Sequence, residues 1–375
     1  MGVSGRVSRV VVDLAALRSN IERLAEVAGS SELWAVVKAN AYGHGAVACA
    51  RIAVEAGARG LCVALTQEAV ELREAGIEAP IMVLSEQPID DLPHLVRHRI
   101  ICVVYNADYV TALDAESRRQ AIVSDVHLKV DTGMHRVGVS PEDAVERAVD
   151  ISGRAGLRLR GVMTHLATAD DPGHPLADRQ IAAFRRTVIG IRAVVPGLLH
   201  VHASNSAATL RSLMPESTLV RVGIATYGLQ PAPGVDTDAL QLRPVMSLRT
   251  RVSHVRRVPA GESVSYGQRT ILTRDANVAT LPIGYADGIP RRAWQTDARI
   301  LVGGVPRRIV GVVTMDQLMV DCGDDPVAIG DDAVIIGTQG ECTIRVEDWA
   351  EALGTITYEV VTAISARVPR DYRGS

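Results

Sequence analysis

The sequence predicts an eight-stranded (β/α)8 barrel of the TIM type, followed by a mostly antiparallel β domain. Between residues 33 and 228, eight short β-branched segments alternate with longer segments of helical periodicity. Most of the eight are near-continuous apolar runs, as in parallel strands that are buried on both faces. After residue 231 the chain changes to short alternating segments separated by turns rich in Pro, Gly and Asp, a pattern typical of antiparallel strands.

Barrel strands are expected at 33–38, 60–65, 80–85, 101–105, 126–130, 161–165, 201–204 and 219–224, with helices at 46–56, 67–75, 141–154 and 178–195. Thr66 and the Ser140-Pro141 pair mark helix starts, because proline fits the first helical position. Eight alternations over about 200 residues match a barrel. An open doubly wound sheet is the alternative, and the lack of a GxGxxG segment after the first strand disfavours it.

In the second domain, strands are expected at 245–258, 276–281, 299–302, 307–313, 317–321 and 333–336, with one helix at 345–353. The linker lies near 231–243, where the chain reads Pro-Ala-Pro-Gly at 231–234. We therefore expect a barrel domain over 1–240 and a β domain over 241–375. The first strand, 9–13, precedes the barrel and is a candidate for pairing with the β domain.

Composition excludes several partner classes. The 375 residues include 40 basic and 43 acidic side chains, a formal net charge of -3, so neither nucleic acid nor a membrane surface is expected as a partner. No run approaches the ~18 apolar residues of a membrane span, and residues 1–12 lack the apolar core of a signal peptide. Five scattered cysteines without a CxxC pair indicate reduced thiols and a cytoplasmic location. The ten histidines lack metal-binding spacing, so no metal is expected.

Lysine occurs only as Lys38 and Lys129, and every other basic residue is arginine. Lys38 ends the first expected strand. A lysine at the mouth of an apolar strand is partly desolvated, which lowers its pKa and makes the free amine available. Arginine cannot replace such an amine, because guanidinium stays protonated in proteins. The position suits a Schiff base or a general base, and a lysine that merely caps the strand is the alternative.

Residues 35–45, AVVKANAYGHG, resemble the pyridoxal phosphate (PLP) attachment segment of the alanine racemase family. Further segments similar to that family follow in the same order through nearly the whole chain. They are KVDTGMHR at 129–136, THLA at 164–167, HASNS at 202–206, RVGIATYG at 221–228, VSYG at 264–267, IGYADG at 283–288, TMDQ at 314–317, YE at 358–359 and RVPR at 367–370. The family fold is an eight-stranded barrel followed by a β domain, which agrees with the strand pattern.

The resemblance implies that Lys38 attaches PLP covalently and that several groups hold the PLP phosphate. These groups are the side chains of Tyr42, Ser204 and Tyr358 and the backbone of Gly223 and Ile224. Independently of the resemblance, the loops after strands seven and eight of a barrel are a common phosphate site. Taken alone, Tyr42 is also consistent with a helix start, and Tyr358 with a core residue.

The resemblance places Arg221 at the pyridine nitrogen of PLP, where many PLP enzymes have a carboxylate. A permanent cation there disfavours protonation of the ring, which favours return of a proton to the α-carbon over side reactions such as transamination. His165 is similar to the histidine that neighbours the ring and this arginine. Taken alone, an arginine at a strand end is more often part of an ion pair, and a histidine on a buried strand is usually a satisfied core residue.

Racemisation needs a base on each face of the α-carbon. The resemblance assigns Lys38 to the D-alanine side and Tyr266 to the L-alanine side. A tyrosine has a pKa of about 10, so its surroundings must lower that value before it acts as a base at neutral pH. In the family this tyrosine comes from the partner subunit, which implies an obligate homodimer with two shared active sites.

Four further residues match the family's substrate site. Arg136 resembles the residue that steadies the cofactor hydroxyl and the substrate carboxylate, a task that suits bidentate geometry. Met315 and Asp316 match the pair at the substrate carboxylate, and Tyr285 matches a tyrosine that filters small substrates in the access corridor. Thr314 stands where family members often have cysteine, which alters pocket polarity and removes a reactive thiol.

Lys129 matches a lysine that family members carry as a carbamate, which holds the arginine as an anion would. Only a neutral amine captures carbon dioxide, so arginine could not take this role. The alternative is a lysine that balances the charge of Asp131.

Together these matches imply an alanine racemase activity: PLP-dependent interconversion of L- and D-alanine that supplies D-alanine for bacterial peptidoglycan. A serine or broad-specificity racemase is the nearest alternative, because a few pocket side chains decide substrate choice. A decarboxylase on the same plan is disfavoured by Arg221. A PLP-carrier protein built on the barrel alone is disfavoured by the second domain and by Tyr266.

Overall fold

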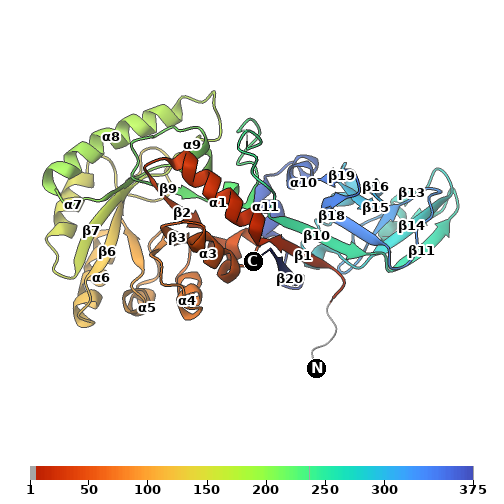
Figure 1. Cartoon of the computed structure of the whole chain (residues 1–375), viewed down its shortest axis with the longest axis horizontal. Coiled ribbons are helices and arrows are strands. Elements are labelled where there is room, and N and C mark those ends of the chain that lie inside the picture. The colour runs from red at the N-terminus through yellow and green to blue at the C-terminus, as the bar shows by residue number, and fades with distance from the viewer. Residues whose placement is uncertain (1–5, 236, 375) are drawn as a thin grey trace. The chain divides into compact units, whose positions relative to one another are not determined.

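The computed structural model describes residues 6–235 and 237–374 (Figure 1). The chain forms two compact units. The first, called here the barrel unit, comprises Leu17–Ala41 and Gly45–Arg243. The second, the β unit, comprises the described N-terminal residues through Ala16, the short segment Tyr42–His44 and the described residues from Pro244 onward.

The barrel unit contains one sheet of eight parallel strands in the order β8-β7-β6-β5-β4-β3-β2-β9. The strands are β2 (Glu32–Val36), β3 (Gly60–Val63), β4 (Ile81–Val83), β5 (Ile101–Val104), β6 (Ser124–Lys129), β7 (Leu157–Met163), β8 (His200–His202) and β9 (Leu219–Val222). The sheet nearly closes, because the Thr218 N–H donates to Val201 O and the Arg221 N–H to Ser204 O, both at 2.9 Å. All eight predicted strands are confirmed, and every residue of β3 and β4 is buried.

Helices alternate with these strands. They are α1 (Leu14–Ala28), α3 (Ala46–Glu55), α4 (Thr66–Glu74), α5 (Leu92–Arg97), α6 (Ala107–Arg119), α7 (Ala144–Ser152), α8 (Leu176–Val194) and α9 (Ser206–Leu210). The predicted start of α7 at residue 141 was wrong. The hydroxyl of Ser140 accepts the N–H of Asp143 at 3.1 Å and donates to its carboxylate at 2.7 Å, so residues 141–143 form a turn ahead of the helix.

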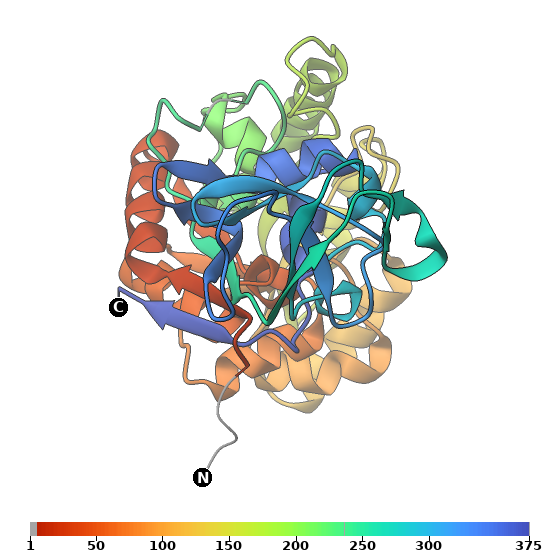
Figure 2. The same cartoon turned by 90° about the vertical axis from the view of Figure 1, so that its right-hand side faces the viewer.

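The β unit is built on a second sheet, whose main path runs β11-β14-β17-β16-β15-β18-β10-β1-β20, with β19 paired to β18. Its strands are β1 (Arg9–Asp13), β10 (Met246–Arg251), β11 (His254–Val258), β14 (Ala276–Leu281), β15 (Arg299–Val302), β16 (Val305–Ile309), β17 (Leu318–Asp321), β18 (Asp332–Gln339), β19 (Cys342–Ile344) and β20 (Arg370–Arg373), and β12 (Ser263–Val264) pairs separately with β13 (Thr270–Ile271). Pairing is antiparallel except between β1 and β20, which lie side by side in Figure 2.

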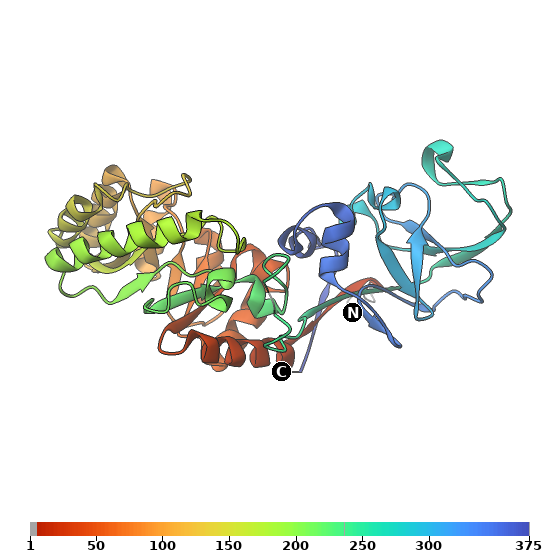
Figure 3. The same ribbon diagram turned by 90° about the horizontal axis from the view of Figure 1, so that it is seen from above.

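One strand prediction in the β unit was wrong. Residues 245–258 form two strands, β10 and β11, because β10 pairs with β18 whereas β11 pairs with β14. The N–H of Val252 donates to Asp331 O, and the N–H of Ser253 donates to Thr280 O, both at 2.9 Å. Two helices, α10 (Val346–Leu353) and α11 (Thr357–Thr362), pack on each other (Figure 3). Trp349 of α10 is buried and donates its indole N–H to Ile335 O at 2.9 Å.

Candidate active site

Lys38 follows β2 and opens α2 (Lys38–Tyr42), a turn with left-handed backbone. The φ angles are 51° at Ala39, 54° at Asn40, 53° at Ala41 and 52° at Tyr42. Left-handed backbone costs a residue that has a side chain roughly 1–2 kcal/mol, so the surroundings must hold this turn in place. Backbone strain of this kind clusters at functional sites.

Glu68, in the first turn of α4, holds the beginning of the left-handed turn. Its Oε1 atom accepts the N–H of Ala39 at 2.5 Å. Its Oε2 atom accepts the N–H groups of Ala64 and Leu65 at 2.8 and 3.1 Å. One carboxylate therefore caps a helix and fixes the residue next to Lys38. The sequence does not indicate this role, because an acidic residue in a first helical turn is explained by capping alone.

Lys38 follows strand β2 and Lys129 ends strand β6, and both lysines have lowered pKa values. Burial lowers the pKa of Lys38, Arg136 and Arg221 lower it further, and the carboxylate of Glu68 opposes them. Burial also lowers the pKa of Lys129 to about 8, with help from the same two arginines. A substantial fraction of neutral amine near physiological pH is thus available at Lys129, and the Lys38 amine is easier to deprotonate than an exposed one.

Arg221, on β9, is a buried cation surrounded by acceptors. Its guanidinium donates to the carbonyls of Thr164 and Ala203 at 3.1 and 3.2 Å. It also reaches His202 Nδ1 at 2.7 Å and His165 Nδ1 at 3.3 Å. Burial lowers its pKa to about 10, so the side chain remains charged at neutral pH.

The contact with Arg221 determines which nitrogen of His202 carries the proton. Burial and Arg221 lower the pKa of His202 well below its ordinary value, so the ring is neutral. Guanidinium can only donate, so Nδ1 accepts and Nε2 carries the hydrogen. His202 Nε2 then donates to His127 Nδ1 at 2.8 Å. His127 is also buried, and burial lowers its pKa to about 3. Gly161 leaves the space for its ring, because a Cβ there would lie 2.7 Å from it.

The loops after β8 and β9 meet at a serine hydroxyl. Ser206 Oγ accepts the N–H of Gly223 at 2.9 Å and that of Ala225 at 3.4 Å. Ser204 is equally buried, but its backbone carbonyl is what contacts β9, by accepting the N–H of Arg221 at 2.9 Å. Ile224 begins the next 3-10 turn and is buried. The hydroxyl beside Gly223 is therefore that of Ser206, a further residue of the HASNS segment, while the predicted role of Ser204 stays a prediction.

Arg136 follows a tight turn after β6. Asp131 Oδ1 accepts the N–H groups of Gly133, Met134 and His135 at 2.9 to 3.1 Å. The carboxylate of Asp131 thus organises the turn that presents Arg136, an exposed side chain. The positive charge of Arg136 lowers the pKa of both Lys38 and Lys129.

The remaining predicted residues belong to the β unit. The rings of Tyr42 and Tyr358 lie 5.9 Å apart, so two of the predicted phosphate residues are neighbours. The following residue, Gly43, packs against α11 so closely that a Cβ would collide with the carbonyl of Val361. Its own carbonyl accepts the Nε–H of Arg370 at 3.0 Å.

Tyr266 is presented on a strained turn and its side chain is 71% exposed. Ser265, just before it, has a φ of 68° and donates its hydroxyl to Val312 O at 2.7 Å. Gly311, with a φ of 73°, gives Ser265 the space it occupies, because a Cβ there would lie 2.6 Å from the Ser265 Cβ. Tyr266 and Thr314 border the same hollow on this unit.

Tyr285, Met315 and Asp316 lie on two adjoining turns of the β unit. The Tyr285 N–H donates to Thr314 O at 2.9 Å. Thr314 also closes its own turn, because its hydroxyl donates to Gln317 O at 2.8 Å and accepts the Gln317 N–H at 3.1 Å. A threonine hydroxyl therefore fixes the turn that carries Met315 and Asp316.

Comparison with known proteins gives consistent matches over nearly the whole chain. The alanine racemase N-terminal domain family matches residues 12–231 and the C-terminal domain family residues 245–372. The alanine racemase of Symbiobacterium thermophilum is 43% identical over 366 residues, which cover 97% of this chain and 96% of the relative. The alanine racemase of Thermobifida fusca is 42% identical over 372 residues, with 97% of each chain covered. The chain belongs to the alanine racemase family.

Solved structures agree with this membership. The crystal structure of alanine racemase from the D-cycloserine producer Streptomyces lavendulae superposes with a TM-score of 0.93 at 40% identity, covering 100% of this chain and 98% of that one. The alanine racemase of Streptomyces coelicolor gives a TM-score of 0.92 at 40% identity, with 98% of each chain covered. The predicted fold class is confirmed, and the activity class of this alanine racemase family member is that of a racemase, an isomerase. Over the described residues, the structure contains no helix of sufficient length and apolarity to cross a bilayer.

Proposed function

We propose that this racemase uses PLP to interconvert L-alanine and D-alanine, supplying D-alanine for peptidoglycan. The observation that carries the proposal is the position of Lys38 beside a strained left-handed turn. Burial and nearby cations, including the buried Arg221, lower the pKa of its amine. The alanine racemases among the relatives support alanine as the substrate.

The groups of the barrel unit fit PLP. The Lys38 amine suits attachment of an aldehyde. The Ser206 hydroxyl, which accepts the Gly223 N–H, can donate its own hydrogen to a phosphate. Arg221 offers only N–H donors to a ring nitrogen. When bound, PLP supplies the electron sink that stabilises negative charge at the α-carbon. The residues expected to hold PLP are Lys38, Tyr42, His165, Ser204, Ser206, Arg221, Gly223, Ile224 and Tyr358.

Lys38 Nζ and Tyr266 Oη hold and move the proton on opposite faces of the α-carbon in this proposal. The lowered pKa of Lys38 supports its part, because a general base works best when its pKa lies near the operating pH. The exposed position of Tyr266 suits a hydroxyl that acts on the site of a second copy of the chain. We therefore propose a homodimer with two shared active sites, working in the cytoplasm where the five free cysteines stay reduced.

The substrate carboxylate is assigned to Arg136, Met315 and Asp316, and Tyr285 restricts access to small side chains. Lys129, whose pKa is about 8, has enough neutral amine to form a carbamate. That carbamate would place a negative charge beside the cations Arg136 and Arg221, which otherwise disfavour a charged amine there.

The test is purified protein incubated with PLP and L-alanine, with L-serine as the parallel substrate and chiral chromatography as the readout. We expect conversion of L-alanine to a near-equal mixture of enantiomers, with a lower kcat/KM for serine. An equal or higher kcat/KM for serine would favour the broad-specificity alternative. Absence of D-alanine would overturn the proposal.

A further inference from the structure

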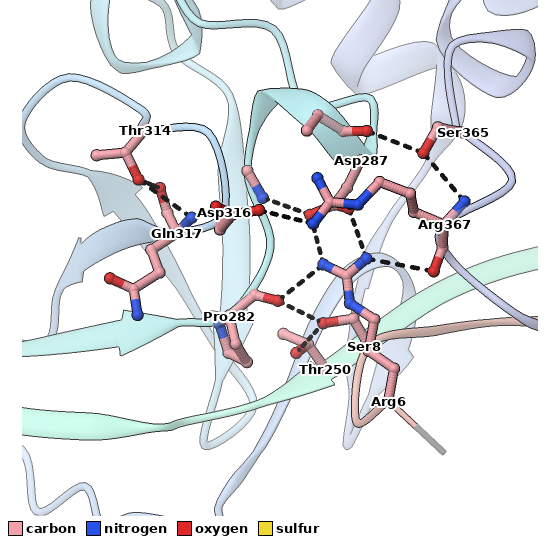
Figure 4. A network of polar contacts seen from close by, with 12 residues as sticks. Arg6, Ser8, Thr250, Pro282, Asp287, Thr314, Asp316, Gln317, Ser365 and Arg367 are labelled. Atoms are coloured by element: carbon pink, nitrogen blue, oxygen red, sulfur yellow. Dashed lines mark hydrogen bonds and ion pairs between the residues drawn. The ribbon is translucent and has the colours of Figure 1, made fainter. Parts of the chain in front are cut away.

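Asp287 lies at the centre of a charged network in the β unit (Figure 4). Its side chain is fully buried, and Arg6 binds both carboxylate oxygens, with one guanidinium nitrogen 2.5 Å from each. Arg6 also donates to the carbonyls of Pro282 and Arg367 at 3.2 and 3.3 Å. A buried carboxylate requires such a partner, because removing the partner leaves an uncompensated charge. A residue of the N-terminal segment thus neutralises a carboxylate 281 positions later.

Asp287 closes the turn 284–288, which carries Tyr285. Its Oδ2 atom accepts the N–H of Gly284 at 2.9 Å. Ser365 holds the same turn from the other side, because its N–H donates to Asp287 O at 3.1 Å and its hydroxyl donates to Ala286 O at 2.9 Å. The position of this turn therefore depends on the buried carboxylate and its arginine.

The turn 284–288 is bonded in turn to the segment that carries Met315. The Tyr285 N–H donates to Thr314 O at 2.9 Å, and the Ala286 N–H donates to Met315 O at 3.0 Å. A Cβ on Gly284 would overlap both of these carbonyl groups. The two turns are therefore in direct backbone contact, and a shift of one displaces the other.

Arg367 joins the two turns through their side chains. Its Nη2 atom donates to Asp316 Oδ1 at 2.7 Å, and its Nε atom lies 3.7 Å from Asp287 Oδ1. Arg6, Asp287, Arg367 and Asp316 thus form a four-residue network with two positive and two negative charges. Figure 4 shows the guanidinium groups of Arg6 and Arg367 close to the Asp287 carboxylate.

We propose that Arg6 and Arg367 are positioning residues that clamp these two turns and neutralise Asp316, so that the segment Met315–Asp316 presents a preset site for an anionic carboxylate. This inference rests on the proposed function, in which that segment meets the carboxylate of alanine. An unpaired aspartate would repel a carboxylate, whereas an aspartate paired with arginine carries no net charge. Remote residues that fix a binding group within a fraction of an ångström have large effects on rate.

The first experiment uses PLP-loaded wild type and Arg367→Gln. Propionate, the carbon skeleton of alanine without its amine, is titrated by calorimetry, and KM and kcat for L-alanine are measured alongside. We expect propionate affinity to fall and KM to rise by about tenfold or more, with a smaller change in kcat and unchanged absorbance of bound PLP. The matched control is Arg251→Gln, which removes an exposed pair with Asp332 in the same unit and should change none of these values.

A double variant, Arg367→Gln with Asp316→Asn, separates charge from scaffolding. Removing both charges should restore a large part of the propionate affinity lost in the single variant, because the repulsion is gone. A merely structural loss would not be repaired by a second substitution. Equal affinity in the single and double variants would overturn the electrostatic part of the proposal.

Arg6 is tested with two variants, because Arg6→Gln leaves Asp287 buried without its partner. Arg6→Lys keeps the charge but cannot bind both oxygens in a fork. We expect kcat/KM for L-alanine to fall about 10- to 100-fold in Arg6→Gln and less in Arg6→Lys. Arg251→Gln, which removes the exposed pair with Asp332, is again the control.

The outcomes distinguish the clamp from the proposed function. The clamp would be overturned if Arg367→Gln kept the wild-type propionate affinity and KM. It would also be overturned if Arg6→Lys and Arg6→Gln kept the wild-type kcat/KM. Neither result would affect the proposed function, provided that the wild type racemises alanine. Wild type that binds propionate without racemising alanine would overturn the proposed function, and weaker binding by Arg367→Gln would still support the clamp.

Discussion

The two units hold their candidate site residues in opposite ways. In the barrel unit, Lys129, His202 and Arg221 are buried, and burial lowers the pKa of each. In the β unit, Tyr266 and Met315 are 71% and 52% exposed, and hydrogen bonds and ion pairs behind them fix the turns on which they stand. Among these residues, burial lowers the pKa in the barrel unit, whereas hydrogen bonds and ion pairs fix position in the β unit. This contrast can be tested by substitutions that affect one property and spare the other.

The largest effect is expected from Lys38→Ala. Loss of the amine should abolish the visible absorbance of covalently bound PLP and reduce racemisation by at least about 10³-fold. Lys38→Arg is the matched control for charge, and it should fail equally because guanidinium does not lose its proton. Absorbance and activity that survive in either variant would assign the attachment to another residue.

Tyr266→Phe should distinguish attachment of PLP in the barrel unit from proton transfer by the β unit. Because the ring remains and only the hydroxyl is lost, we expect the absorbance of bound PLP to persist while racemisation falls about 10²- to 10⁴-fold. The measurement is the rate of L-alanine conversion together with an absorption spectrum of the same sample. Full activity in this variant would show that Lys38 has a different partner in proton transfer.

Lys129→Met tests the effect of burial on protonation in the barrel unit. Lys129 has a pKa of about 8 in the fold and 10.5 as its ordinary value, so the unfolded chain binds more protons between these pH values and stability rises with pH across that window. The cost of burying the charge is fully present below pH 8. Lys129→Met should therefore raise the free energy of unfolding at pH 7 by about 1–3 kcal/mol, and the gain should shrink above pH 8.

Urea unfolding at several pH values, without bicarbonate, measures the effect of this substitution. Lys129→Arg keeps the charge and should give no such gain at pH 7. If the lysine forms a carbamate, added bicarbonate should stabilise the wild type and leave Lys129→Met unchanged. A methionine variant as pH-dependent as the wild type would contradict the burial argument.

Ser206→Ala and Ser204→Ala form a matched pair within one segment. Because Ser206 Oγ lies at the Gly223 N–H, we expect its loss to weaken PLP binding about tenfold, or 1.4 kcal/mol. Ser204→Ala should have a smaller effect, since the backbone carbonyl that contacts β9 is retained. Equilibrium dialysis of PLP against each variant shows which hydroxyl contributes more to PLP binding. A larger loss of affinity in Ser204→Ala would favour Ser204, the residue predicted from the sequence, as the phosphate ligand.

The smallest effect is expected at Glu68. Glu68→Ala should lower the free energy of unfolding by about 1 kcal/mol, because the N–H groups at Ala39 and Ala64 lose their acceptor. Glu68→Gln should cost less, since an amide oxygen still accepts. Both variants remove a negative charge that raises the pKa of Lys38, so the pH midpoint of PLP attachment should move to lower pH. An unchanged midpoint would mean that Glu68 affects the backbone alone.

Barrel strands were predictable because their signal is local. A strand such as Ile81–Val83 is apolar at every position and bounded by turn residues, so burial on both faces can be inferred without knowing its neighbours. The division of 245–258 was not predictable in this way, because it depends on pairing with Asp331 and Thr280, which are distant in sequence.

The residues of the candidate site can be proposed from the sequence, but their backbone conformation cannot. The motif around Lys38 indicates the amine, but no residue at 39–42 is a glycine, and the left-handed conformation depends in part on a carboxylate 29 residues away. The choice between Ser204 and Ser206 likewise depends on which hydroxyl faces Gly223. The partners of the Arg6–Asp287 pair are 281 positions apart, so neither local sequence indicates the pair.

Because lysine is scarce, chemical labelling of side-chain amines can be assigned to individual residues in this chain. Reductive trapping of an aldehyde on a side-chain amine can mark only Lys38 or Lys129, since the sequence has no other lysine. Digestion after each arginine would place the two in different peptides, so a single mass spectrum would report the site and the extent of attachment. The same spectrum, taken across pH, would follow deprotonation of each amine separately in the intact fold, without any substitution.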